Sequence, residues 1–215
     1  MRRAAVAIVL LLSGCASAQP SATQPPSETP LSTPIGSIGE AIRALGAPGE
    51  TLIPGRYSRA AFEPRVTFEV EDGWTAQQVA AGFFDIQQDP GSLDVIAVQF
   101  GNVVGPSTAA EAVAEVQGHD QLEVTRSDEA MVDGIEGSRI TVETSDPATT
   151  QPPIFRQVLT LRAGPISIAS ARRLQLTLLD TSNGVLAIMV GGSIREWDRT
   201  LELAMPVVES VTIGE

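Results

Sequence analysis

A single cysteine, Cys15, constrains how this chain can be stabilised, because one thiol forms no internal disulfide. The folded part must therefore rely on a hydrophobic core. Hydrophobic residues make up 43% of the chain, which suits a globular protein and is too many for a disordered one. Aromatic residues make up only 4%, so we expect Val, Ile, Leu and Ala to fill most of the core.

The formal net charge of -12 excludes nucleic acid as a partner, because binding to nucleic acid depends on cations that neutralise phosphate. All basic residues are arginines, and lysine is absent. An acidic chain also gains nothing electrostatically from anionic lipid headgroups. Any attachment to a membrane must therefore have another source.

The first residues have the layout of an export signal. Met1-Arg2-Arg3 is positively charged, and Ala4 to Leu12 is an unbroken apolar run. Nine residues at about 1.5 Å each span roughly half of a 30 Å hydrocarbon core. The run is therefore too short for a transmembrane helix and is typical of a signal peptide.

Leu12-Ser13-Gly14-Cys15 resembles the lipobox of bacterial lipoproteins. The resemblance implies cleavage before Cys15, so that residues 1–14 form the signal peptide and lipid is attached to Cys15. Several acyl chains hold a protein firmly, because each buried methylene adds about 0.8 kcal/mol. We therefore expect a protein anchored by lipid at the extracytoplasmic face of the cell membrane or outer envelope. The alternative is an ordinary signal peptide cut near Ala16-Ser17-Ala18.

The rest of the chain divides into a linker and one domain. Residues 15–35 are rich in Pro, Ser and Thr and contain one charge, Glu28, so this segment cannot bury enough apolar surface to fold. Its prolines favour an extended stalk. Residues 36–215 are long enough to bury one sizeable core.

Capping boxes predict three helix starts. They are Ser37 with Glu40, Thr108 with Glu111, and Ser193 with Glu196. We expect the first two helices to end at Gly46 and Gly118. Pro206 should kink or split the last one.

Alternating or continuous apolar runs predict strands over most of the remaining chain. The candidates are Val66–Val70, Phe83–Gln87, Leu93–Phe100, Gln121–Thr125, Ser138–Thr144, Ile154–Leu161, Ile166–Ala169, Arg173–Leu179 and Val185–Val190. Asp89-Pro90-Gly91 predicts a turn, and Asn183-Gly184 favours a tight hairpin. Short spacings favour antiparallel pairing. The predicted fold class is therefore α+β, a central antiparallel sheet with helices packed on it.

A search for catalytic, cofactor-binding and metal-binding residues gives no candidate set. His119 is the only histidine, and we interpret it as an exposed residue at a helix end. No nucleophile motif, phosphate-binding loop or Cys/His cluster is present in the sequence. Glu69, Glu71 and Asp72 could bind calcium, although a solvated strand end is the simpler interpretation. Cys15, as the lipidation site, is the one functional residue that we assign.

The aromatic residues are interpreted mainly as structural. We expect Trp74 at the edge of the core, with a ligand platform as the alternative. Trp197 should face the core from the last helix. Tyr57 should lie beside a turn.

The order of these features resembles the PsbP-like fold, and the opening resembles that of small bacterial lipoproteins of unassigned function. The resemblance is carried by Pro54–Tyr57, Phe62–Val70, Asp72–Trp74, Val132–Arg139, and the final hairpin and helix from Asp180 to Val211. It implies an α/β/α sandwich whose members are mostly accessory or binding proteins. It carries over no catalytic residue.

The leading hypothesis is a non-enzymatic, lipid-anchored accessory or binding protein that contacts an envelope protein or a small ligand. We expect no cofactor. A second hypothesis is a carboxylate-based hydrolase of envelope glycan, which would need paired carboxyl groups in a concave site. A third is a solute-binding component of a transporter. The sequence sets neither the ligand nor the oligomeric state.

Overall fold

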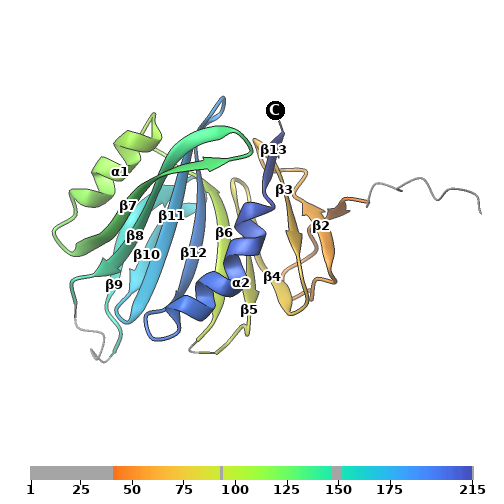
Figure 1. The fold of residues 1–215 in the computed structure, drawn as a ribbon, viewed down its shortest axis with the longest axis horizontal. Helices are drawn as coiled ribbons and strands as arrows, with labels where there is room; N and C mark the ends of the chain where they lie inside the picture. Colours follow the sequence, from red (N-terminus) through yellow and green to blue (C-terminus); the bar gives the residue numbers. More distant parts are fainter. Residues whose placement is uncertain (1–40, 93, 147–151, 215) are drawn as a thin grey trace, which may run out of the picture. The chain divides into compact units, whose positions relative to one another are not determined.

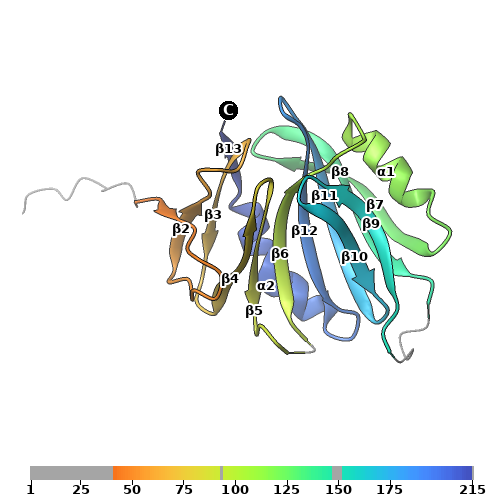
Figure 2. The same cartoon turned by 180° about the vertical axis from the view of Figure 1, so that it is seen from behind.

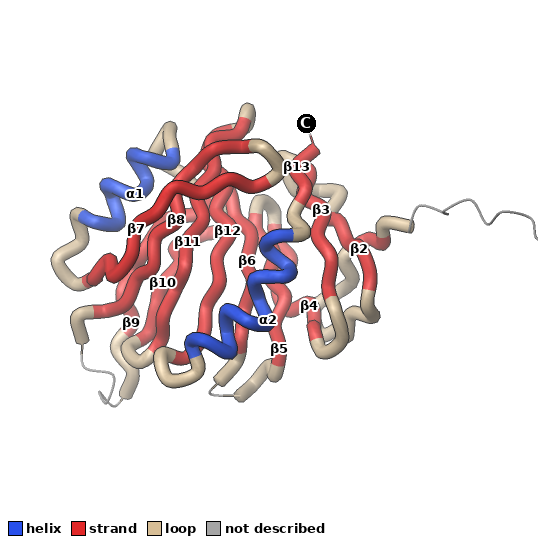
Figure 3. The backbone as a smooth tube through the Cα atoms, viewed as in Figure 1, coloured by secondary structure: helices blue, strands red, loops and turns tan. Residues whose placement is uncertain are grey.

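The computed structural model describes residues 41–92, 94–146 and 152–214. Within these ranges the chain forms thirteen strands and two helices, drawn in Figures 1 and 3. Most of the strands belong to one seven-stranded antiparallel sheet. In spatial order its strands are β4 (Trp74–Ala80), β5 (Phe83–Gln88), β6 (Ile96–Asn102), β12 (Gly184–Ser193), β11 (Arg172–Thr181), β8 (Ile135–Thr144) and β7 (Leu122–Val132).

The centre of the large sheet is the β11–β12 hairpin, which pairs over ten residues of each strand. Thr181 pairs with Gly184, so the connecting residues are Ser182 and Asn183. Gly184 has a φ of 102°, a conformation that favours glycine. The hairpin is therefore predicted by the sequence, but its glycine begins β12 and lies outside the two-residue turn.

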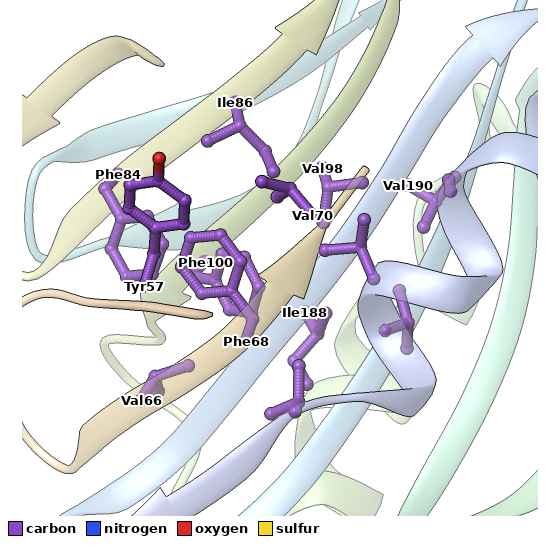
Figure 4. Close-up of a cluster of buried hydrophobic side chains, with 14 of the residues drawn as sticks. Tyr57, Val66, Phe68, Val70, Phe84, Ile86, Val98, Phe100, Ile188 and Val190 are labelled. Atoms are coloured by element: carbon purple, nitrogen blue, oxygen red, sulfur yellow. The ribbon is translucent and has the colours of Figure 1, made fainter. Parts of the chain in front are cut away.

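One face of the large sheet packs against α2 (Trp197–Glu209) and a small sheet. The small sheet contains β1 (Arg43–Ala44), β2 (Gly55–Ser58), β3 (Arg65–Val70) and β13 (Thr212–Gly214). Phe68, Phe84 and Phe100 stack between the two sheets, as Figure 4 shows. The ring centroids of Phe84 and Phe100 are 4.5 Å apart. A small number of aromatic side chains therefore fills much of the space between the two sheets.

The other face packs against α1 (Ala109–Gln117) and a two-stranded sheet. That sheet pairs β9 (Phe155–Leu161) with β10 (Gly164–Ala169), and Figure 2 shows β10 in front of the large sheet. Alternate residues of β12 serve the two cores: Ile188 and Val190 join the first, and Ala187 and Met189 join the second. This alternation explains why the β12 sequence is continuously apolar.

Much of this organisation is as predicted, and the antiparallel sheet is confirmed. Helix α1 begins and ends where expected: Thr108 accepts a hydrogen bond from the Glu111 backbone N–H at 3.2 Å, and Gly118 caps the end. The α/β/α description is only roughly correct. Each face carries a single helix, and a smaller sheet covers much of the remainder.

Three local predictions differ from the structure. Residues 41–46 contain β1 where the end of a helix was expected, while Ser37 and Glu40 lie outside the described residues. Pro206 does not split α2, which continues to Glu209. The Ser193 hydroxyl accepts a hydrogen bond from Arg195 N–H, and α2 begins at Trp197 without a side-chain cap. Of the described helices, neither is long and apolar enough to cross a membrane.

Candidate binding groove

A row of paired residues on the α1 side of the large sheet contains two adjacent positions with almost no side chain. Gln87, Ala97, Gly191 and Leu174 pair in turn across β5, β6, β12 and β11. Directly paired residues of antiparallel strands share one face. The two small residues at the centre therefore leave a depression in the sheet, which we call the Ala97–Gly191 groove.

The depression at Gly191 has room for a Cβ atom. A Cβ atom built on this residue would have only the Leu174 Cδ1 atom near it, at 3.7 Å. Gly101, two rows along on the same face, differs because its missing side chain is replaced by Leu161, whose Cδ1 atom would lie too close to a Cβ there. The groove is thus a vacancy in the packing at one place, while the equivalent space at Gly101 is filled.

The walls of the groove come from β10 and from the start of β9. Ile168 and Ile166 of β10 provide apolar contacts, and Phe155 forms the rim. Phe155 is 67% exposed, the largest exposed fraction among the large hydrophobic residues described. The cavity volume is about 220 Å³. A mostly apolar hollow with a few polar groups is typical of small-ligand sites.

Two glutamine side chains of the groove are held by a buried carboxyl group, Asp85. Gln87 Nε2 donates to Asp85 Oδ2 at 2.8 Å, and the Gln78 backbone N–H donates to Oδ1. Gln99 also hydrogen-bonds to this carboxyl. Burial raises the pKa of Asp85 above its ordinary value, and these hydrogen bonds oppose the rise. The amide nitrogens of both glutamines are therefore fixed toward Asp85.

The positive charge of the groove comes from Arg172, at the first position of β11. Its Nη2 donates to the Val95 carbonyl at 2.6 Å, which holds the guanidinium group in place. Burial lowers the pKa of Arg172 and the charge of Asp94 opposes that shift; an arginine stays protonated in either case. Arg173 also borders the groove, but its side chain lies on the opposite face, beside Glu143 and the Trp197 ring.

A hollow larger than the groove is a notch between the start of α1 and the β7–β8 hairpin, about 590 Å³ in volume. Glu129, Glu136 and Asp180 line it together with the exposed Met131. Asp180 Oδ1 already accepts a hydrogen bond from the Ala109 backbone N–H at 2.6 Å. None of the described residues that line the notch is aromatic, so it lacks the stacking surface expected of a sugar cleft.

The aromatic residues singled out from the sequence are all buried. Trp74 is 1% exposed and Trp197 is 8% exposed, so the interpretation of both as core residues is confirmed. The interpretation of Tyr57 is wrong. It lies in β2, stacks near Phe68, and donates its hydroxyl hydrogen to the Ile53 carbonyl at 2.9 Å.

The polar candidates lie apart from the groove. Glu69, Glu71 and Asp72 border a separate hollow beside Trp74, and Glu69 forms an ion pair with Arg56 at 3.3 Å. Among the described residues no group of three acidic, His or Cys side chains could hold a metal ion. His119 is half-buried after the end of α1, near Asp120 and Arg156. Cys15 lies outside the described residues.

Sequence reasoning missed Asp85, Arg172 and Phe155. An acidic residue in the apolar run Phe83–Ile86 was the one available signal, because a charge in a buried strand needs partners. The vacancy at Gly191 depends on strand register. Register cannot be read from the local sequence.

Comparisons with known proteins give no family and no function. No family model matches the chain, and no curated protein matches it. Solved structures similar to it include the cyanobacterial PsbP, CyanoP, of Synechocystis sp. PCC 6803. The two are 17% identical, with a TM-score of 0.44, over 84% of this chain and 99% of CyanoP.

Two further similar structures have lower scores. LpqN of Mycobacterium tuberculosis, described as involved in cell envelope biogenesis, is 12% identical with a TM-score of 0.41, over 84% of this chain and 93% of LpqN. A protein from Bacteroides thetaiotaomicron is 10% identical with a TM-score of 0.40, over 70% of this chain, and the match spans 45% of that protein. The structural neighbours thus include PsbP-like proteins, and at these identities they assign no activity.

Proposed function

We propose that this chain is a lipid-anchored, extracytoplasmic accessory or binding protein of the bacterial cell envelope. In this proposal Cys15 carries the anchor, and the domain contacts an envelope protein or a small ligand through the Ala97–Gly191 groove. It performs no chemistry on what it binds. The signal-like N-terminus and the Leu12–Cys15 motif support the anchor.

The observation that carries the binding proposal is the groove itself. Its apolar floor is unfilled, its two amides are fixed by Asp85, and an exposed phenylalanine forms its rim. Such a surface suits recognition, since fixed polar groups give orientation and apolar surface gives affinity. His119, the only histidine of the chain, is not among the residues that line the groove and borders a different hollow after α1.

The test is in-cell crosslinking of the full chain, followed by affinity purification and mass spectrometry. The native protein is compared with a Cys15→Ala variant that cannot receive lipid. We expect a saturable partner or ligand that is lost or weakened in the variant, and an intact mass showing lipid on Cys15 of the native protein. An unlipidated native protein would refute the anchor.

A second variant separates the groove from the anchor. Gly191→Val keeps Cys15 and fills the floor of the groove, and Met131→Ala serves as a control on a different exposed apolar residue. Capture should fail with the first and persist with the second. Turnover of an envelope substrate that is abolished by a point change would overturn the non-enzymatic proposal.

A further inference from the structure

The Ala97–Gly191 groove differs in charge from four other hollows of the described residues. Each of those four is lined by at least one Asp or Glu. The described residues that line the groove include no carboxylate. In a chain of net charge -12, the lining of the groove thus repels an anion less than the linings of these four hollows do, and the nearest negative charges are Asp85 behind Gln87 and Asp94 near Arg172.

Arg172 adds a positive charge at one end of this groove, and the nearby Asp94 partly offsets that charge. Its guanidinium group is partly buried and is positioned by the Val95 carbonyl. An opposite charge is attracted more strongly in a partly buried site than in bulk water. Arginine also matches the planar geometry of a carboxylate. The charged part of a ligand is thus expected at Arg172.

The two glutamines provide a second point of recognition. Gln87 turns its amide nitrogen toward Asp85, at 2.8 Å, and Gln99 also hydrogen-bonds to that carboxyl. Because a side-chain amide has its oxygen on the other side, the oxygens of Gln87 and Gln99 are turned away from Asp85. A carbonyl oxygen accepts hydrogen bonds. The groove therefore offers acceptors for an N–H group of a ligand.

The remaining surface sets the size and polarity of the ligand. The volume of about 220 Å³ limits the ligand to a small group. Ala97, Gly191 and Leu174 form an apolar floor, and Phe155 can cover it from the rim. One apolar side chain with its adjoining backbone groups fits this space.

We propose that the Ala97–Gly191 groove binds the carboxyl-terminal residue of a peptide with an apolar final side chain. The terminal carboxylate lies at Arg172, and the N–H of the last residue donates to the glutamine oxygens. The side chain rests on the floor under Phe155. This inference rests on the proposed binding function and specifies the chemical class that the groove recognises.

The experiment is a calorimetric titration of the full-length protein, purified from membranes and placed in lipid nanodiscs. The probes are N-acetylglycyl-leucine and the same compound with a carboxamide end. We expect saturable binding of the acid, with a Kd at least about tenfold lower than that of the amide. If the protein binds the acid and the amide with equal affinity, or binds neither, the inference is overturned. This result needs no variant of the protein.

Variants then locate the site. Gly191→Val should abolish binding, and Arg172→Gln should remove the preference for the acid. Phe155→Ala should weaken binding at least about threefold, whereas Met131→Ala, which removes a side chain of similar exposure elsewhere, should not change it. A thermal melt of each variant verifies folding. Acid binding that survives Gly191→Val in a folded protein would place the site elsewhere.

The outcome of the peptide titration can be told apart from the outcome of the crosslinking experiment that tests the proposed function. If crosslinking captures a partner that Gly191→Val loses, while neither probe binds, the groove binds something other than a peptide carboxyl terminus. The proposed function then stands without this inference. If the acid binds and no protein is captured, the ligand is a small peptide and no protein partner is required.

Discussion

Two glycines on the same face of the large sheet are expected to respond oppositely to the same substitution. Gly191→Ala adds a Cβ atom to an unfilled space, with Leu174 Cδ1 the nearest atom at 3.7 Å. Neither glycine has a left-handed φ, so alanine is compatible with the backbone at both positions. Alanine in a strand avoids the entropy cost of glycine, and Gly191→Ala should stabilise the domain by about 0.5–1 kcal/mol.

Gly101→Ala meets the opposite situation. A Cβ atom there would overlap Leu161 Cδ1, and Leu161 is fully buried, so it cannot move without cost. Overpacking of this kind costs about 1–3 kcal/mol, and the entropy gain offsets about 0.5–1 kcal/mol of it. We therefore expect a net loss of about 1–2 kcal/mol.

Urea unfolding followed by circular dichroism measures both variants. With a slope near 2 kcal/mol per molar, Gly101→Ala should lower the midpoint by about 0.5–1 M and Gly191→Ala should raise it slightly. In a Leu161→Ala background the penalty at Gly101 should disappear, because the contact that causes it is gone. Changes of the same sign in the two glycine variants would refute the claim that one space is filled and the other is vacant.

Three further predictions concern the cores and the buried carboxyl group. Phe100→Ala removes a ring stacked on Phe84 at 4.5 Å, and we expect a loss of about 3–5 kcal/mol in urea unfolding. Gly192→Ala places a Cβ atom against the buried Thr200 and should cost about 1–3 kcal/mol. If α2 shifts, the near-ultraviolet circular dichroism of its Trp197 should weaken. Asp85 has a raised pKa in the folded state, so its ionisation opposes folding above the unfolded pKa of about 3.9. Asp85→Asn loses one of the oxygens that accept from Gln87 and Gln78, but its stability relative to the parent should be higher at pH 7 than near pH 3.5. A pH-independent difference in melting temperature would contradict this.

The parts of the fold that the sequence predicted are those where one local signal dominates. The β12 strand is continuously apolar because it is buried on both faces, and α1 has a capping threonine and a terminal glycine. Both signals come from residues that are close in the sequence. The sequence alone is therefore enough to predict these two elements.

The missed elements are strands whose burial depends on distant partners. β4 contains Gln77 and Gln78 at a register shift against β5, which interrupts its alternation. β7 was expected to end at Thr125 but continues to Val132 through an exposed, charged stretch that its sequence does not mark as a strand. The groove was missed for the same reason, since Ala97 and Gly191 come together only through the register of β6 and β12.

The most direct test of a binding protein that works through this groove at the membrane is site-specific photocrosslinking in cells. A photoreactive residue replaces Phe155 at the rim, or Met131 at the acidic notch as a position of similar exposure. We predict a discrete adduct from position 155 that requires Cys15 and disappears with Gly191→Val, and none from position 131. Equal adducts from both positions, or no adduct at 155 in a folded and lipidated protein, would contradict the account.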